Sequence, residues 1–117
     1  MNRLISPALM LMISLPVGVA LAQPIGDPIA GQEKSQTCIA CHGANGASDN
    51  PAFPKLAGQH PDYLLHALQA YRSGERNNAI MNGQAAALSD TDMRDLAAYY
   101  GSLDPALGTL VRDRAPE

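Results

Sequence analysis

The chain of 117 residues contains no tryptophan, one phenylalanine and four tyrosines, so few large aromatic side chains are available for a core. A small domain with this composition buries a modest core, and a bound apolar group would supply the missing volume. Only two cysteines are present, which excludes a framework of several disulfides. Internal repeats, long linkers and low-complexity tracts are also absent, which predicts a single domain.

Positive charge is scarce as well. Eight Lys and Arg residues face eleven Asp and Glu residues, which gives a formal net charge of −3. A chain this acidic is poorly suited to bind nucleic acid or an anionic membrane surface, because like charges repel it.

The N-terminal segment has the pattern of a secretory signal. A short positive segment, residues 2–3, precedes the mostly apolar residues 4–15, and Ala-Leu-Ala at residues 20–22 matches a cleavage site. The apolar run is shorter than the ~20 residues that a membrane span needs. We therefore expect cleavage of residues 1–22, export to the periplasm and no membrane span in the mature protein.

One short motif, C-x-x-C-H at Cys38, Cys41 and His42, carries the chemistry. This pattern is typical of covalent attachment of a c-type haem, in which each thiol adds to a vinyl group and the histidine binds the iron. The single motif predicts one haem c, and this haem would also fill the poorly aromatic core.

Three other interpretations of the two thiols are weaker. A zinc site needs four ligands, but beyond the motif only His60 and His66 are available, and His66 lies on a polar helix face where a solvated histidine is expected. A thioredoxin-like pair needs a βαβ pattern, whereas the flanking sequence is helical. An exported pair of cysteines can form a disulfide, but a disulfide gives no reason for the histidine that follows.

The remaining patterns predict an all-α fold of three main helices. Asp27-Pro28 starts the first helix, which continues to about Thr37. A loop rich in Gly, Asn and Pro follows over residues 43–58. The second helix begins at Pro61 and ends before Gly74. The third begins at a capping box around Ser89 and ends near Asp104. The domain should span residues 23–105, followed by a flexible tail over 106–117.

The second axial ligand is expected to be Met81. It lies in a polar segment, residues 76–84, predicted as a loop, and the other mature methionine, Met93, is needed in the third helix. The ordinary role of a methionine is to fill gaps in a core, and His60 would provide bis-histidine ligation instead. A thioether donor favours ferrous iron and raises the reduction potential.

Together these segments resemble class I cytochromes c, closest to single halves of dihaem bacterial cytochromes c and their monohaem relatives. The similar segments are residues 30–32, 38–43, 53–59, 63–64, 81 and 88–99. The resemblance implies three main helices around the haem, with the first and last crossing at Gly31 and Tyr99. It also implies that the Pro54 carbonyl accepts a hydrogen bond from His42 and that Met81 is the distal ligand.

The resemblance implies a periplasmic one-electron carrier, not an enzyme, with redox proteins as donor and acceptor. A haem subunit of a larger dehydrogenase or oxidase complex is the nearest alternative. A gas sensor or peroxidase would need an open iron, and a disulfide protein would have no haem. Because only one C-x-x-C-H motif is present, two haems side by side would require a homodimer.

Overall fold

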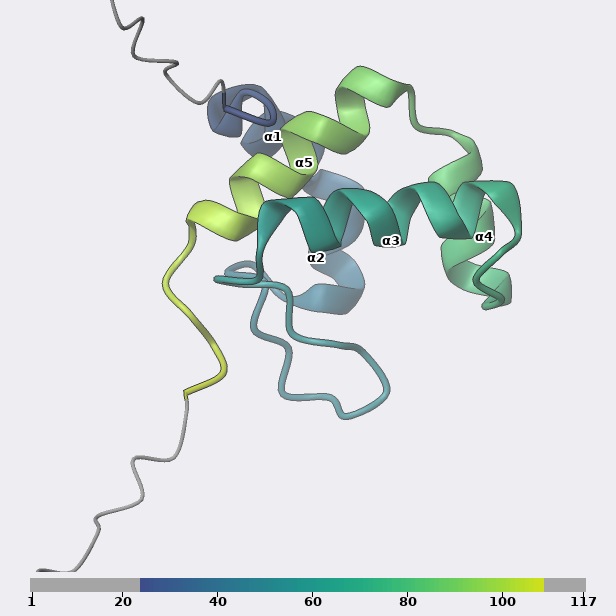
Figure 1. The fold of residues 1–117 in the computed structure, drawn as a ribbon. Helices are drawn as coiled ribbons and strands as arrows, with labels where there is room; N and C mark the ends of the chain where they lie inside the picture. The colour runs from purple at the N-terminus through teal and green to yellow at the C-terminus, as the bar shows by residue number, and fades with distance from the viewer. Residues whose placement is uncertain (1–23, 109–117) are drawn as a thin grey trace, which may run out of the picture.

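The computed structural model describes residues 24–108, and within this range the chain forms helices and no strands. The five helices are α1 (Pro28–Lys34), α2 (Gln36–His42), α3 (Pro61–Ser73), α4 (Ala79–Ala86) and α5 (Asp90–Ser102). In Figure 1, α1 crosses α5, α3 runs along α5, and α4 packs at one end of α3. This confirms the predicted all-α class. No helix in the described range is long and apolar enough to cross a membrane.

The predicted signal, residues 1–22, lies outside the described residues, as does most of the predicted tail. The described beginning of that tail is attached to the loop before α3, because the Ala106 N–H donates to the Ala57 carbonyl oxygen at 3.2 Å.

The crossing of α1 and α5 depends on a glycine. Gly31 is buried, and a Cβ at this position would overlap the Asp95 carbonyl group and lie 2.7 Å from Tyr99 Cβ. The backbones of the two helices therefore approach more closely here than any side chain would allow. Gly31 costs helix propensity in α1, and this close approach is its physical reason.

Beside this crossing, a buried carboxylate joins the two helices. Asp95 is only 6% exposed, and its Oδ2 atom accepts a hydrogen bond from Lys34 Nζ at 2.6 Å. Its Oδ1 atom accepts from the Asp27 backbone N–H at 2.9 Å. Lys34 also pairs with Asp92, at 2.9 Å. The negative charge of the buried Asp95 is therefore compensated. Nothing in the sequence distinguishes Asp95 from the exposed acidic residues.

This arrangement predicts an acid-sensitive contribution to stability. The hydrogen bond from Lys34 holds the pKa of Asp95 below its ordinary value. A carboxyl with a lowered folded-state pKa stabilises the fold above about pH 3.9 and loses this contribution as the pH falls through the folded-state pKa. Asp95→Asn should therefore lower the free energy of unfolding at pH 7, and the difference from the native chain should shrink below pH 4.

Urea unfolding at a series of pH values measures this difference. Asp49→Asn, in the exposed loop after α2, removes the same charge without this contact. An equal effect of the two substitutions at every pH would contradict the role of Asp95.

The predicted first helix is interrupted, which corrects the expectation of one helix from residue 28 to about 37. Ser35 separates α1 from α2 and is fully buried. Its hydroxyl donates to the Gln32 carbonyl oxygen at 2.7 Å, and its backbone N–H bonds the same oxygen at 3.2 Å. This local side-chain bond competes with the regular helical pattern, so the C-x-x-C-H motif lies in a short helix of its own.

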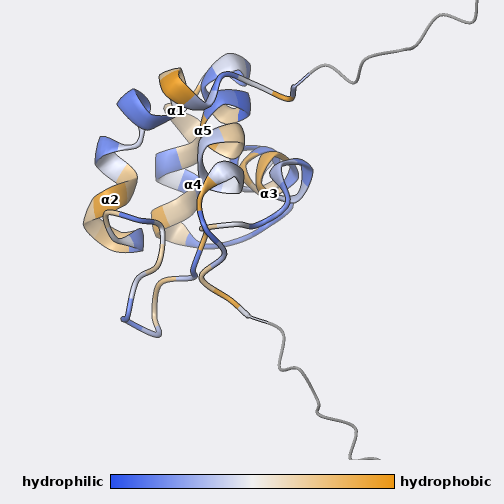
Figure 2. Cartoon of the chain, turned by 90° about the vertical axis from the view of Figure 1, so that its left-hand side faces the viewer, coloured by the Kyte–Doolittle hydropathy of each residue, from blue (hydrophilic) through white to orange (hydrophobic). Residues whose placement is uncertain are grey.

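The long helices α3 and α5 form the core. Its buried members are Leu64, Leu96, Ala97, Tyr99 and Tyr100. Figure 2 shows that these helices carry both hydrophobic and hydrophilic parts, as expected when each is buried on one side. The predicted capping box at the start of α5 is confirmed, because the Ser89 and Asp92 side chains each bond the other residue's backbone.

The loop predicted over residues 76–84 is wrong, because much of it is α4. Met81 lies in the first turn of this helix, and the Asn78 side chain caps it by accepting from the Ile80 and Met81 N–H groups at 3.1 and 3.0 Å. The asparagine that indicated a loop is thus a helix N-cap. Asn82 Nδ2 donates to the Tyr71 carbonyl oxygen at 2.6 Å, which attaches α4 to the end of α3.

Candidate functional site

A cavity of about 310 Å³ opens between α2, α3, α4, α5 and the loop before α3. Its walls are mostly apolar, and one face of α3 forms one of them: Tyr63, Leu64, Ala67, Leu68 and Tyr71 all line the cavity. Cys38, Cys41 and His42 line it from α2, and Met81 lines it from α4. The structure thus brings together residues that are up to 43 positions apart in the chain.

His42 is held in one orientation at the wall of this cavity. It is buried, and its Nδ1 atom lies 2.8 Å from the Pro54 carbonyl oxygen. A carbonyl oxygen can only accept, so Nδ1 carries the proton and the Nε2 lone pair remains available to bind a metal ion. The Phe53 ring packs edge-on against the imidazole, with the ring centroids 6.4 Å apart.

The loop that carries Pro54 is fastened at both ends, which keeps the carbonyl in place. The Leu56 and Ala57 N–H groups donate to the Gly46 carbonyl oxygen at 2.7 and 3.0 Å. The Gly58 N–H donates to the Tyr100 carbonyl oxygen of α5 at 2.9 Å. The orientation of His42 is therefore set by the core and not by the motif alone.

The two thiols are free and half-buried at the cavity wall. Burial raises the pKa of the Cys38 thiol, which keeps it protonated at neutral pH, unlike the thiolate of a redox-active pair. Within residues 24–108 no group of three or more His, Cys, Asp and Glu side chains is arranged to bind a metal ion. The zinc alternative therefore finds no support in the described structure.

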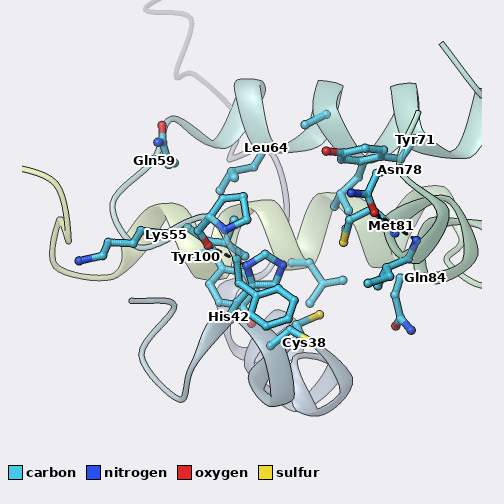
Figure 3. Close-up of a pocket in the computed structure, with 18 of the residues that line it drawn as sticks. Cys38, His42, Lys55, Gln59, Leu64, Tyr71, Asn78, Met81, Gln84 and Tyr100 are labelled. Carbon is cyan, nitrogen blue, oxygen red and sulfur yellow. Dashed lines mark hydrogen bonds between the residues drawn. The ribbon is translucent and has the colours of Figure 1, made fainter. Parts of the chain in front are cut away.

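Figure 3 shows Met81 and His42 extending into the cavity from different helices, with Cys38 at its lower end. Met81 is half-buried, whereas His60 and His66 are exposed and do not line the cavity. Of the ligands considered from the sequence, only Met81 is thus placed with His42 in one cavity.

Among the cavity residues that no sequence pattern indicated are Arg76 and Tyr100. Arg76 lies in the segment assigned to a loop, and nothing in its neighbours indicates contact with the site. Tyr100 belongs to the core and also lines the cavity, and its buried hydroxyl has no hydrogen-bond partner among the described residues. Burial raises the pKa of this hydroxyl well above its ordinary value. In the sequence, only the pair of adjacent tyrosines at 99 and 100 could have indicated that Tyr100 contacts the site.

Comparison with known proteins identifies the family. The sequence profile of the cytochrome c family matches residues 29–104. The chain belongs to the cytochrome c family. It is 44% identical over 108 residues to cytochrome c4 of Pseudomonas aeruginosa, an alignment that covers 92% of this chain and 52% of that protein. It is 48% identical over 80 residues to cytochrome c-554(548) of Halomonas halodenitrificans, covering 66% of this chain and 96% of that one.

The fold agrees with this assignment. The crystal structure of reduced cytochrome c4 from Pseudomonas stutzeri superimposes with a TM-score of 0.65 at 44% identity, covering 68% of this chain and 46% of that chain. This chain therefore has the class I cytochrome c fold, as predicted. It spans about half the length of the cytochromes c4 that it matches and nearly the whole length of cytochrome c-554(548).

A cytochrome c domain with one C-x-x-C-H motif carries one covalently bound haem c. The residues of this cavity fit that group. Both thiols are accessible from the cavity, the walls are apolar, and a histidine with a free Nε2 lone pair lies beside them. The shortage of aromatic side chains is consistent with a core that is completed by the haem.

Proposed function

We propose that this cytochrome c is a one-electron carrier of the periplasm, with His42 and Met81 as the two axial ligands. The observation that carries the proposal is that these two side chains, from α2 and α4, line the same cavity as both thiols. When bound there, haem supplies one-electron exchange between ferric and ferrous iron.

The chain's residues would favour electron transfer over catalysis. The bond from His42 to Pro54 strengthens the imidazole as a donor and restricts its movement. The thioether of Met81 is a soft, neutral donor that raises the reduction potential. With both ligands in place, the chain leaves no axial position for oxygen, peroxide or another substrate, which supports a carrier and not an enzyme.

The proposed location and partners follow from the sequence. Residues 1–22 have the signal pattern, and export fits covalent haem attachment, which takes place outside the bacterial cytoplasm. The partners would be redox proteins that donate and accept the electron.

Absorption spectra of the protein secreted by a haem-attaching bacterial host test this proposal. We expect sharp bands in the reduced state, a weak near-infrared band from sulfur-to-iron charge transfer in the oxidised state, and no response to carbon monoxide. A shift with carbon monoxide and no sulfur band would mean an open iron, and a sensor or peroxidase would replace the carrier. Elution with a larger catalytic chain would indicate a fixed subunit of a complex.

The thioether bonds give a further prediction. Cys38→Ala should leave at most one covalent link, through Cys41, so the haem should still be retained but with one vinyl group unreacted. The pyridine haemochrome spectrum measures this, because an intact vinyl group moves the reduced band to longer wavelength. Thr37→Ala, a neighbour that also lines the cavity, should leave the spectrum unchanged. An unshifted band in Cys38→Ala would exclude Cys38 from the linkage.

A further inference from the structure

We infer that Arg76 binds a carboxylate of the haem and that Tyr63 and Tyr71 hold its guanidinium group in position. The inference requires the covalently bound haem c but not the axial ligands or the carrier function proposed above. The two proposals can therefore fail separately.

The chemistry of haem places its carboxylates away from the cysteines. The two vinyl groups and the two propionates occupy opposite edges of the porphyrin, so the edge joined to Cys38 and Cys41 faces away from the propionates. Figure 3 shows Cys38 at one end of the cavity and Leu64 and Tyr71, both from α3, at the other. The carboxylates of a haem joined to these cysteines would therefore be directed to the α3 side.

Arg76 lies on that side and is held by two residues of α3. Its Nη1 atom is 3.4 Å from the Tyr63 hydroxyl oxygen, and its guanidinium carbon lies 5.0 Å from the centroid of the Tyr71 ring. All three residues line the cavity. In the contact with Arg76 the Tyr63 oxygen accepts, so its own O–H remains free to donate to a carboxylate.

Arg76 forms no ion pair with any other residue of the described structure. In the ion pairs among residues 24–108, Lys34 and Arg72 face carboxylates and Arg76 does not. Arg76 therefore lies exposed at the rim of an apolar cavity and has no carboxylate partner among the described residues. Its planar fork of N–H donors matches a carboxylate in a way that a lysine does not. Lys55 also lines the cavity, but Figure 3 shows its amine directed outward.

Loss of this contact has a measurable consequence. A nearby positive charge lowers the pKa of a carboxylic acid by one unit or more. As the propionate ionises, its negative charge stabilises ferric iron, so the reduction potential falls through an inflection at the propionate pKa. Arg76→Gln should therefore lower the potential and move this inflection upward by about one pH unit or more.

The chain offers a matched control. Arg72→Gln also removes one positive charge, in this case from the end of α3. Arg72 pairs with Asp90 at 2.5 Å and does not line the cavity. We expect the potential of Arg72→Gln to follow the native pH profile, and Arg76→Lys to retain the charge and restore part of the native inflection. The resonance Raman band of propionate bending should shift in Arg76→Gln only.

Identical pH profiles and Raman bands in Arg76→Gln and Arg72→Gln would overturn the inference. A shift in Lys55→Gln without one in Arg76→Gln would also overturn it, because the carboxylate would then be bound from the opposite side. Arg76 is exposed, so its substitution should leave the fold intact, and far-ultraviolet circular dichroism verifies this for each variant.

Discussion

Met81→Ala should lower the reduction potential by a clear margin within the roughly 0.8 V range over which axial ligands set haem potentials. Removing the thioether takes away the donor that favours ferrous iron. It also leaves an axial position open, so the reduced protein should bind carbon monoxide at neutral pH. Potentiometric titration and absorption spectra with carbon monoxide measure the two effects.

The control for this substitution lies on the same helix. Gln84 lines the cavity from α4, and Gln84→Ala should change the potential little and leave the iron closed. Because alanine is favourable in helices, neither substitution should disturb α4. An unchanged potential in Met81→Ala would remove Met81 from the site, and His60 or an external ligand would then have to be considered.

Gly31→Val should destabilise the haem-loaded protein by about 3 kcal/mol or more, as expected for overpacking at a close contact. Any Cβ at this position overlaps the Asp95 carbonyl group, so α1 and α5 must separate. The shift would also weaken the bonds between Asp95 and α1, described above. Urea unfolding at pH 7 measures the loss, and Gly31→Ala should show a smaller loss in the same direction.

Gly83 provides the matched control for this prediction. It lies within α4, and a Cβ there would have no atom within 4 Å. Gly83→Ala should therefore stabilise the protein by about 0.5–1 kcal/mol through helix propensity alone. A loss at Gly83 as large as that at Gly31 would show that glycine is required for reasons other than the crossing.

The structure departs from the predicted first helix and the predicted loop for definite physical reasons. Ser35 ends α1 because its buried hydroxyl bonds a backbone carbonyl, and burial cannot be read from a serine in a polar sequence. Asn78 and Asn82 resemble loop residues, but one caps α4 and the other joins it to α3. A short helix fixed by such contacts has no strong hydrophobic period of its own, so its existence depends on the neighbouring helix.

The sequence by itself determined the chemistry and the helix class. The motif at residues 38–42 indicates a c-type haem because local spacing is enough to place two thiols and an imidazole together. The apolar face of α3 and the capping box of α5 are likewise local, since helical periodicity and caps involve residues three or four positions apart.

Only the tertiary structure decided which distant residues meet. The bond from Lys34 to Asp95, the bond from Asn82 to Tyr71 and the position of Arg76 over Tyr71 each join separate segments, and none of them was expected from the sequence. Such contacts depend on how the helices pack, and a buried aspartate or an arginine at a cavity has no sequence pattern that distinguishes it from its exposed counterparts.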